Sequence, residues 1–272
     1  MKKIAFLFLT LALCALSFTA CDGDPADTTT IATYPQSNPA SDFVFEESEN
    51  GVNLFVKRYI GTDSIAVIPA EVDEKPVVSI DSFSNEEVEV LWVPDSVKNL
   101  LRLGFCPSLR EVHLGKGLKY IYAEAFSGCD SLETIVIPEG VETIVSHAFS
   151  GCESLRSVTF PSTVTKMGSE MFLFSPAIEE VIFQEGIEKV GGYAFFWGCE
   201  SLHELTFPKS VKYVGECTLA NSGVTKVTFL GDAPEFGDGA LETRMGNLTV
   251  YYPKDAKGWE NLSFENVTFV PY

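Results

Sequence analysis

The strongest constraint on the fold is a pattern that recurs along the chain at a nearly constant interval. Residues 125–155, "AFSGCDSLETIVIPEGVETIVSHAFSGCESL", contain nearly the same segment twice. A strand motif, apolar-x-x-apolar-x-apolar, begins at almost evenly spaced positions: Val88, Leu109, Leu132, Leu155, Ile178, Leu202 and Val224. A unit this short cannot bury its apolar edge alone, so the repeat predicts a solenoid in which each coil stacks on its neighbours through short parallel strands.

Other positions recur inside each unit. An aromatic position, preceded by Ala in three units, follows the second apolar pair and is occupied by Phe105, Phe126, Phe149, Phe172, Phe195 and, in the last unit, Leu219. The next recurring position holds Cys106, Cys129, Cys152, Ser175 and Cys199. Because this ladder accepts Ser, we expect small buried packing residues, although a disulfide or a metal site stays open. Cys217 lies off the ladder and is predicted to be a lone thiol.

The unit "LETIVIPEGVETIVSHAFSGC", residues 132–152, resembles the BspA-type leucine-rich repeat, which is also seen in a treponemal leucine-rich repeat protein. The resemblance covers about residues 43–270. It implies a repeat solenoid, a leucine-rich repeat-like right-handed coil stack of about 23-residue units that is capped at both ends. Two units depart from the pattern. The unit at Ile178 has Ser175 in place of Cys and Gln184 in place of Pro, and the unit at Leu109 has a shortened turn, "GFCPSL".

The two ends of the chain differ from the array at residues 70–246. Residues 1–20 have the layout of an export signal, and "FTAC" resembles a bacterial lipobox, so Cys21 is expected to carry a lipid anchor. An ordinary secretion signal is the alternative. Residues 21–41 are rich in Asp, Thr, Ser and Pro and predict a disordered tether.

Two caps are predicted to cover the open ends of the stack. Residues 42–69 alternate apolar and polar side chains around the pair Asn50 and Gly51, which predicts a β-hairpin and an N-terminal β cap. Residues 247–272 contain one further strand, Pro253 and Trp259, and are similar to the C-terminal caps of the family.

Charge and motifs exclude several function classes. A formal charge of −19 argues against nucleic acid as a partner, because phosphate binding needs clustered Lys and Arg. The sequence contains no nucleophile elbow, phosphate-binding loop, HExxH or dinucleotide fingerprint. His113, His147 and His203 lie in different units without a paired carboxylate at a repeated offset. We therefore predict no enzyme, no cofactor and no metal.

The strand motif indicates a candidate binding face. Strand side chains alternate between two sides, so the third and fifth positions of each motif point away from the core. These positions form the candidate binding face: Val90, Trp92, Glu111, His113, Thr134, Val136, Ser157, Thr159, Glu180, Ile182, Glu204, Thr206, Lys226, Thr228, Thr249 and Tyr251. Trp92 is either a binding anchor or is covered by the N-terminal cap. Trp197, in "FFWGC" with the one-residue insertion of its unit, either makes contacts from a turn or covers the solenoid edge.

The export signal and the lipobox-like segment, together with the resemblance, predict a lipid-anchored, monomeric lipoprotein of the bacterial outer membrane or cell surface, which touches the membrane through its anchor only. Its expected work is adhesion to an extracellular protein ligand of a host or another cell. The alternative is a glycan-binding lipoprotein, for which Trp92, Tyr251 and Trp197 would have to form one platform. A third hypothesis, an enzyme or enzyme inhibitor, would need a nucleophile beside His113 and Glu111.

Overall fold

The structure, a computed structural model, describes residues 34–103 and 106–272. The predicted signal peptide, the predicted lipidation site Cys21 and the tether up to residue 33 lie outside the described residues, as do position 104 and Phe105 of the aromatic ladder. Residues 34–272 form one compact unit. Within the described residues, no helix is long and apolar enough to cross a membrane.

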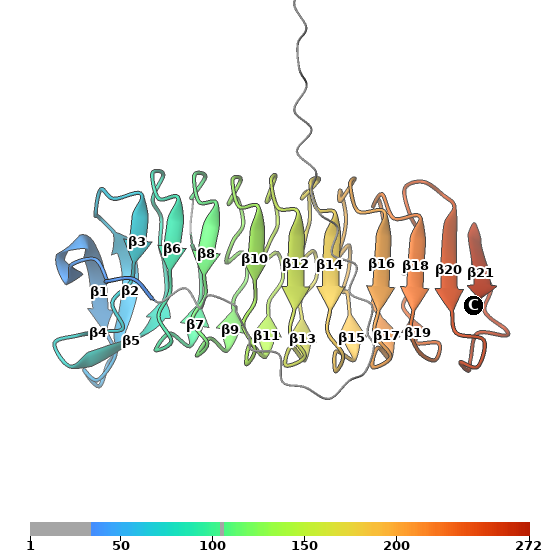
Figure 1. Ribbon diagram of the computed structural model, residues 1–272, viewed down its shortest axis with the longest axis horizontal. Coiled ribbons are helices and arrows are strands. Elements are labelled where there is room, and N and C mark those ends of the chain that lie inside the picture. The colour runs from blue at the N-terminus through green and yellow to red at the C-terminus, as the bar shows by residue number, and fades with distance from the viewer. Residues whose placement is uncertain (1–33, 104–105) are drawn as a thin grey trace, which may run out of the picture. The chain divides into compact units, whose positions relative to one another are not determined.

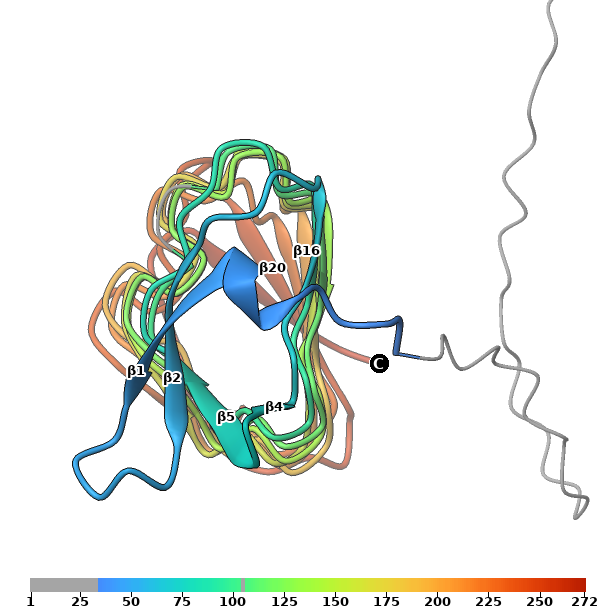
Figure 2. The same cartoon turned by 90° about the vertical axis from the view of Figure 1, so that its left-hand side faces the viewer.

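The unit is a stack of coils with two strand-bearing faces (Figure 1). The long face consists of β3 (Ile65–Val67), β6 (Val90–Trp92), β8 (Glu111–His113), β10 (Thr134–Val136), β12 (Ser157–Phe160), β14 (Glu180–Phe183), β16 (Glu204–Phe207), β18 (Lys226–Phe229), β20 (Leu248–Tyr252) and β21 (Val267–Pro271). The short face consists of β5 (Lys75–Ile80), β7 (Asn99–Leu100), β9 (Tyr120–Ile121), β11 (Thr143–Ile144), β13 (Lys166–Met167), β15 (Lys189–Val190), β17 (Tyr213–Val214) and β19 (Glu235–Phe236). Viewed along the stack, successive coils superimpose around a common interior (Figure 2).

Strand pairing follows the sequence repeat. The long-face strands pair in parallel with residues one unit away, as in Val158 with Val181 of the next coil. This confirms the predicted solenoid of about 23-residue units with short parallel strands. The long face is divided into two hydrogen-bonded sheets, β3-β6-β8 and β10-β12-β14-β16-β18-β20-β21, so the predicted face is interrupted between β8 and β10. β8 belongs to the unit at Leu109, which has the shortened turn "GFCPSL", so the interruption comes directly after this unit.

A stack of phenylalanine rings fills the interior. The ring centroids of Phe126 and Phe149 lie 5.2 Å apart, and those of Phe149 and Phe172 lie 5.6 Å apart, with nearly parallel planes. The predicted aromatic ladder is correct over these three rings. In the next coil, Phe196 continues the stack on Phe172 at 5.6 Å, whereas the ring of Phe195 crosses Phe172 at 74°. The assignment of Phe195 to the ladder was therefore wrong by one residue.

The physical reason is the position of the inserted residue. Lys189 pairs with Tyr213, a step longer by one residue than that from Thr143 to Lys166, so the insertion comes after Lys189. A left-handed residue recurs at one equivalent position of successive coils, as at His147 (φ 60°), Ala194 (φ 53°) and Cys217 (φ 49°). The step from Ala194 to Cys217 has the usual length again, so the extra residue lies between positions 190 and 193 and not in "FFWGC".

The cysteine ladder is a packing element. Cys106, Cys129, Cys152 and Cys199 are buried free thiols, and Ser175 is equally buried. Cys152 Sγ donates to the carbonyl of Phe126 (3.2 Å), and Ser175 Oγ donates to that of Phe149 (2.8 Å). Desolvation by burial raises the pKa of Cys106 to about 11 and of Cys152 to about 12. These side chains fill a small space and satisfy a buried carbonyl, which a serine also does.

The N-terminal end is covered by two segments. The predicted hairpin forms, with β1 (Phe43–Glu47) antiparallel to β2 (Leu54–Tyr59), and β2 continues the short face beside β5. The short strand β4 (Glu71–Val72) pairs with β5, and a 3-10 turn, η1 (Ala40–Asp42), precedes the hairpin. In Figure 2 this end faces the viewer.

Residues 34–38 cover the edge of β3, although composition predicts a disordered tether there. Asn38 donates its backbone N–H to the carbonyl of Val67 (3.0 Å), and its side-chain oxygen accepts the N–H of Val67 (2.6 Å). The hydroxyl of Tyr34 donates to the carbonyl of Ile68. This segment is ordered because it satisfies polar groups that an open strand edge would leave unpaired.

The C-terminal end is closed by an aromatic cluster. Trp259 is buried, and its ring lies 4.8 Å from that of Tyr252 and 5.0 Å from that of Phe229. The indole N–H donates to the carbonyl of Gly231 (3.2 Å). Beyond this cluster, β21 pairs in parallel with β20 and ends the sheet.

Candidate binding face

The structure places every predicted face residue on the outer side of the long face. None of these side chains is buried, whereas the residues between them are: Leu91, Val112, Ile135, Val158, Val181, Leu205, Val227 and Val250. The parallel register aligns the outward positions in rows, so that Val136, Thr159 and Ile182 are consecutive neighbours across three strands. The candidate binding face is therefore a ribbon of aligned side chains, divided between β8 and β10.

The N-terminal end of the face is partly covered. The rings of Trp92 and His113 stack with centroids 3.6 Å apart, and the ring of Tyr34 meets Trp92 edge-on at 5.8 Å. His113 Nε2 in turn lies 2.7 Å from a carboxylate oxygen of Glu111. Trp92 is thus half-buried between Tyr34, from the segment that composition assigns to the tether, and His113 of the next strand. Tyr34 was missed as part of this cluster because it belongs to a segment that composition assigns to the tether.

The centre of the face is open. Val136 is 73% exposed, and Thr134 beside it is also exposed. Ser157 and Thr159 on the next strand are half-buried, because β10 and β14 flank their strand on both sides. Sequence reasoning did not single out Ile65, which is 49% exposed and extends the row of Val90 by one strand.

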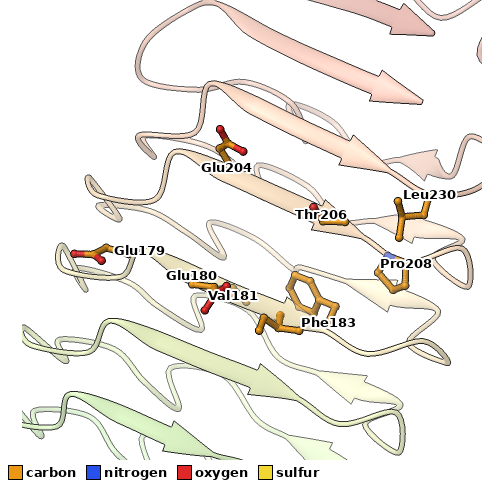
Figure 3. A pocket seen from close by; sticks show the side chains of 9 residues that line it. Glu179, Glu180, Val181, Phe183, Glu204, Thr206, Pro208 and Leu230 are labelled. Carbon is orange, nitrogen blue, oxygen red and sulfur yellow. The ribbon is translucent and has the colours of Figure 1, made fainter. Parts of the chain in front are cut away.

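A hollow lies in the face between β14 and β16 (Figure 3). Its volume is about 350 Å³, and it contains four predicted face residues, Glu180, Ile182, Glu204 and Thr206. Glu179, Val181, Phe183, Pro208 and Leu230 complete its lining. Strand pairing is sparse at this point. β14 and β16 share only the pair Ile182–Thr206, whereas four pairs join β12 to β14 and four join β16 to β18.

The C-terminal end of the face carries a cation. Lys226 Nζ lies 2.8 Å from a carboxylate oxygen of Glu204 and 5.8 Å from the ring centroid of Tyr251. The hydrogen bond to Glu204 is the main cause that raises the pKa of Lys226. Thr228 and Thr249 are half-buried beside it.

Trp197 lies on a turn, away from the face strands, and is 37% exposed. Its carbonyl accepts the N–H of Phe174 (2.8 Å), which is 61% exposed. Trp92, Trp197 and Tyr251 come from different coils, and the ring contacts of the described residues do not join any two of them.

The histidines are not assembled into a catalytic group. His147 Nε2 lies 2.9 Å from Glu170, and His203 Nδ1 lies 3.2 Å from the carbonyl oxygen of Gly223. Among residues 34–103 and 106–272, no three His, Cys, Asp or Glu side chains gather in a way that could hold a metal ion.

Comparison with known proteins gives a family match and two similar folds. The profile of the BspA type leucine-rich repeat region matches residues 77–197 and 195–270, in six copies. A solved leucine-rich repeat protein of T. pallidum is 26% identical, with a TM-score of 0.56 over 72% of this chain and 87% of that chain. A leucine-rich repeat protein from Bacteroides ovatus is 18% identical, with a TM-score of 0.54 over 78% of this chain and 70% of that chain, and is similar in fold. No curated protein matches the sequence.

Proposed function

Because the chain belongs to the BspA-type leucine-rich repeat family, we propose that it is a surface adhesin whose long face binds an extracellular protein. Leucine-rich repeat stacks offer extended, preformed surfaces for protein–protein interaction. The observation that carries the proposal is the alignment of outward-facing side chains across β10, β12, β14 and β16 on a close-packed core. Such a face loses little conformational entropy on binding, which favours affinity.

The proposed display on the cell surface rests on the sequence. Export by residues 1–20 and lipidation of Cys21 would hold the array at a membrane through acyl chains, each methylene of which contributes about 0.8 kcal/mol on burial. Changing Cys21 to Ser is expected to move the protein from the membrane fraction to the soluble fraction. Sedimentation of the Cys21→Ser variant with membranes would contradict the anchor.

The ligand class is tested by binding the array to a panel of extracellular matrix proteins and polysaccharides. The test variant carries Val136→Lys and Thr159→Lys, which are paired neighbours on the long face. The control carries Tyr120→Lys and Thr143→Lys, which are paired neighbours on the short face and add the same charge.

We expect saturable binding to a protein, weakened at least tenfold by the long-face change and retained by the short-face change. Equal loss in both variants would contradict a role for the long face. Binding to polysaccharide alone would instead support a glycan-binding lipoprotein.

A further inference from the structure

The hollow between β14 and β16 lies in a coil that departs from the repeat. This coil carries Ser175 and Gln184 at positions where Cys and Pro are common, and the following turn contains the inserted residue. On the short face, the pairing is also broken between β13 and β15. The sheet is therefore loosened at this point, and a depression forms between the two strands.

The two ends of the hollow differ in chemistry. Figure 3 shows the carboxylates of Glu179, Glu180 and Glu204 toward one end and Phe183, Pro208 and Leu230 toward the other. Its lining contains three glutamates and no lysine or arginine. Ile182, which is 43% exposed, and Leu230, which is 37% exposed, give the other end an apolar surface.

The carboxylates at the acidic end of the hollow are only partly neutralised by ion pairs. Glu179 is paired with Arg156 at 3.1 Å, and Glu204 is paired with Lys226 at 2.8 Å, both on the outer sides of the hollow. Among the ion pairs of the described residues, none includes Glu180. A cation entering the hollow would therefore meet one unpaired carboxylate and two that are partly neutralised.

The spacing along β14 restricts the ligand further. Glu180 and Ile182 lie on the same side of the strand, two residues apart, which is about 6.6 Å at 3.3 Å per residue. An extended polypeptide has the same period, so its residues i and i+2 match this distance. A basic side chain beside Glu180 would also meet Glu204, and an apolar side chain two positions away would cover Ile182 at the apolar end of the hollow.

We infer that the hollow accepts an extended polypeptide segment in which a basic residue and an apolar residue lie two positions apart. This inference rests on the proposed function and specifies what a protein ligand must present at one part of the long face. Charge complementarity and the exposed apolar surface both select this occupant over a neutral glycan.

The test uses the purified full-length protein and two fluorescent peptides of identical composition. The first contains the core Ser-Thr-Arg-Thr-Leu-Thr-Ser, and the second has the core Ser-Thr-Arg-Leu-Thr-Thr-Ser, in which the apolar residue directly follows Arg. Binding is measured by fluorescence anisotropy against wild type, Glu180→Gln, Ile182→Ser and the control Glu153→Gln. Glu153 is exposed on a turn outside the hollow, and its change removes the same charge.

We expect the first peptide to bind more tightly than the second, and Glu180→Gln and Ile182→Ser each to weaken it about fivefold, as for partly exposed contacts. Glu153→Gln should leave its affinity unchanged. Equal affinity for both peptides, no effect of Glu180→Gln, or displacement of the first peptide by equimolar spermine would overturn the inference.

The outcome can be separated from that of the proposed function. If an extracellular protein binds the long face but neither Glu180→Gln nor Ile182→Ser weakens it or the peptide, the inference fails and the proposed function remains. If the peptide binds as expected but no extracellular protein does, the site remains and the proposed adhesin function fails.

Discussion

The stacked phenylalanines provide the sharpest test of how the fold is stabilised. Phe149 is fully buried, and its ring is sandwiched between Phe126 at 5.2 Å and Phe172 at 5.6 Å. Changing Phe149 to Ala removes a buried aromatic side chain and leaves a cavity, which costs about 3–5 kcal/mol. Both stacking contacts are lost with the ring, so we expect about 4 kcal/mol or more, close to the whole stability of many domains.

The measurement is urea denaturation followed by far-UV circular dichroism and by tryptophan fluorescence. The matched control is Phe174→Ala, the same change at a ring that is 61% exposed. Its backbone is left-handed (φ 56°) with either residue, and little packing is lost, so the free energy of unfolding should change by about 0.5 kcal/mol or less. A loss below about 1.5 kcal/mol for Phe149→Ala, or equal effects of the two changes, would refute the argument.

Three further predictions concern the cysteine ladder and the strand edge. Cys152→Ser should cost no more than about 1 kcal/mol in thermal melts, because Ser175 already occupies an equivalent position with a hydrogen bond of 2.8 Å; a loss above about 3 kcal/mol would contradict this equivalence. Burial raises the pKa of Cys152 to about 12, so its stabilising effect is complete below the unfolded-state pKa of about 8.5 and is lost as pH rises toward 12. At pH 8 a thiol reagent should therefore label Cys217, which is half-buried, before the ladder cysteines, and equal labelling rates would be evidence against the buried ladder. Asn38→Ala should destabilise the array by about 1–2 kcal/mol in urea denaturation, because the N–H of Val67 loses its acceptor, and an unchanged midpoint would show that this edge needs no cover.

Most of the fold could be predicted because the repeat determines which side chains must meet. Alternation in the strand motif predicted the buried and outward sides of the long-face strands from β6 to β20, and Asn50 with Gly51 predicted the hairpin. The predicted position of the insertion was wrong because the greater length of a unit does not say where its extra residue lies. A turn can absorb it at Gly191 and Gly192 and shift the aromatic stack from Phe195 to Phe196.

The candidate site was less predictable than the fold. Sequence alone identified Glu180, Ile182, Glu204 and Thr206 as outward, but not that they line a hollow, because the loosening of one ladder depends on the geometry of the whole coil. Tyr34 was missed for another reason: a single tyrosine in a polar segment gives no signal until its partner is seen in space.

The gap between β8 and β10 has a mechanical consequence. Tension along the stack passes through every coil boundary in series, so the boundary with the fewest cross-strand bonds yields first. Within the described residues, no long-face pair joins β8 to β10, and only Tyr120–Thr143 and Ile121–Ile144 join the same coils on the short face. The next boundary has three long-face pairs in addition to two short-face pairs. Pulled from its ends, the array would part into two blocks here, and the break would separate the stacked rings of Phe126 and Phe149.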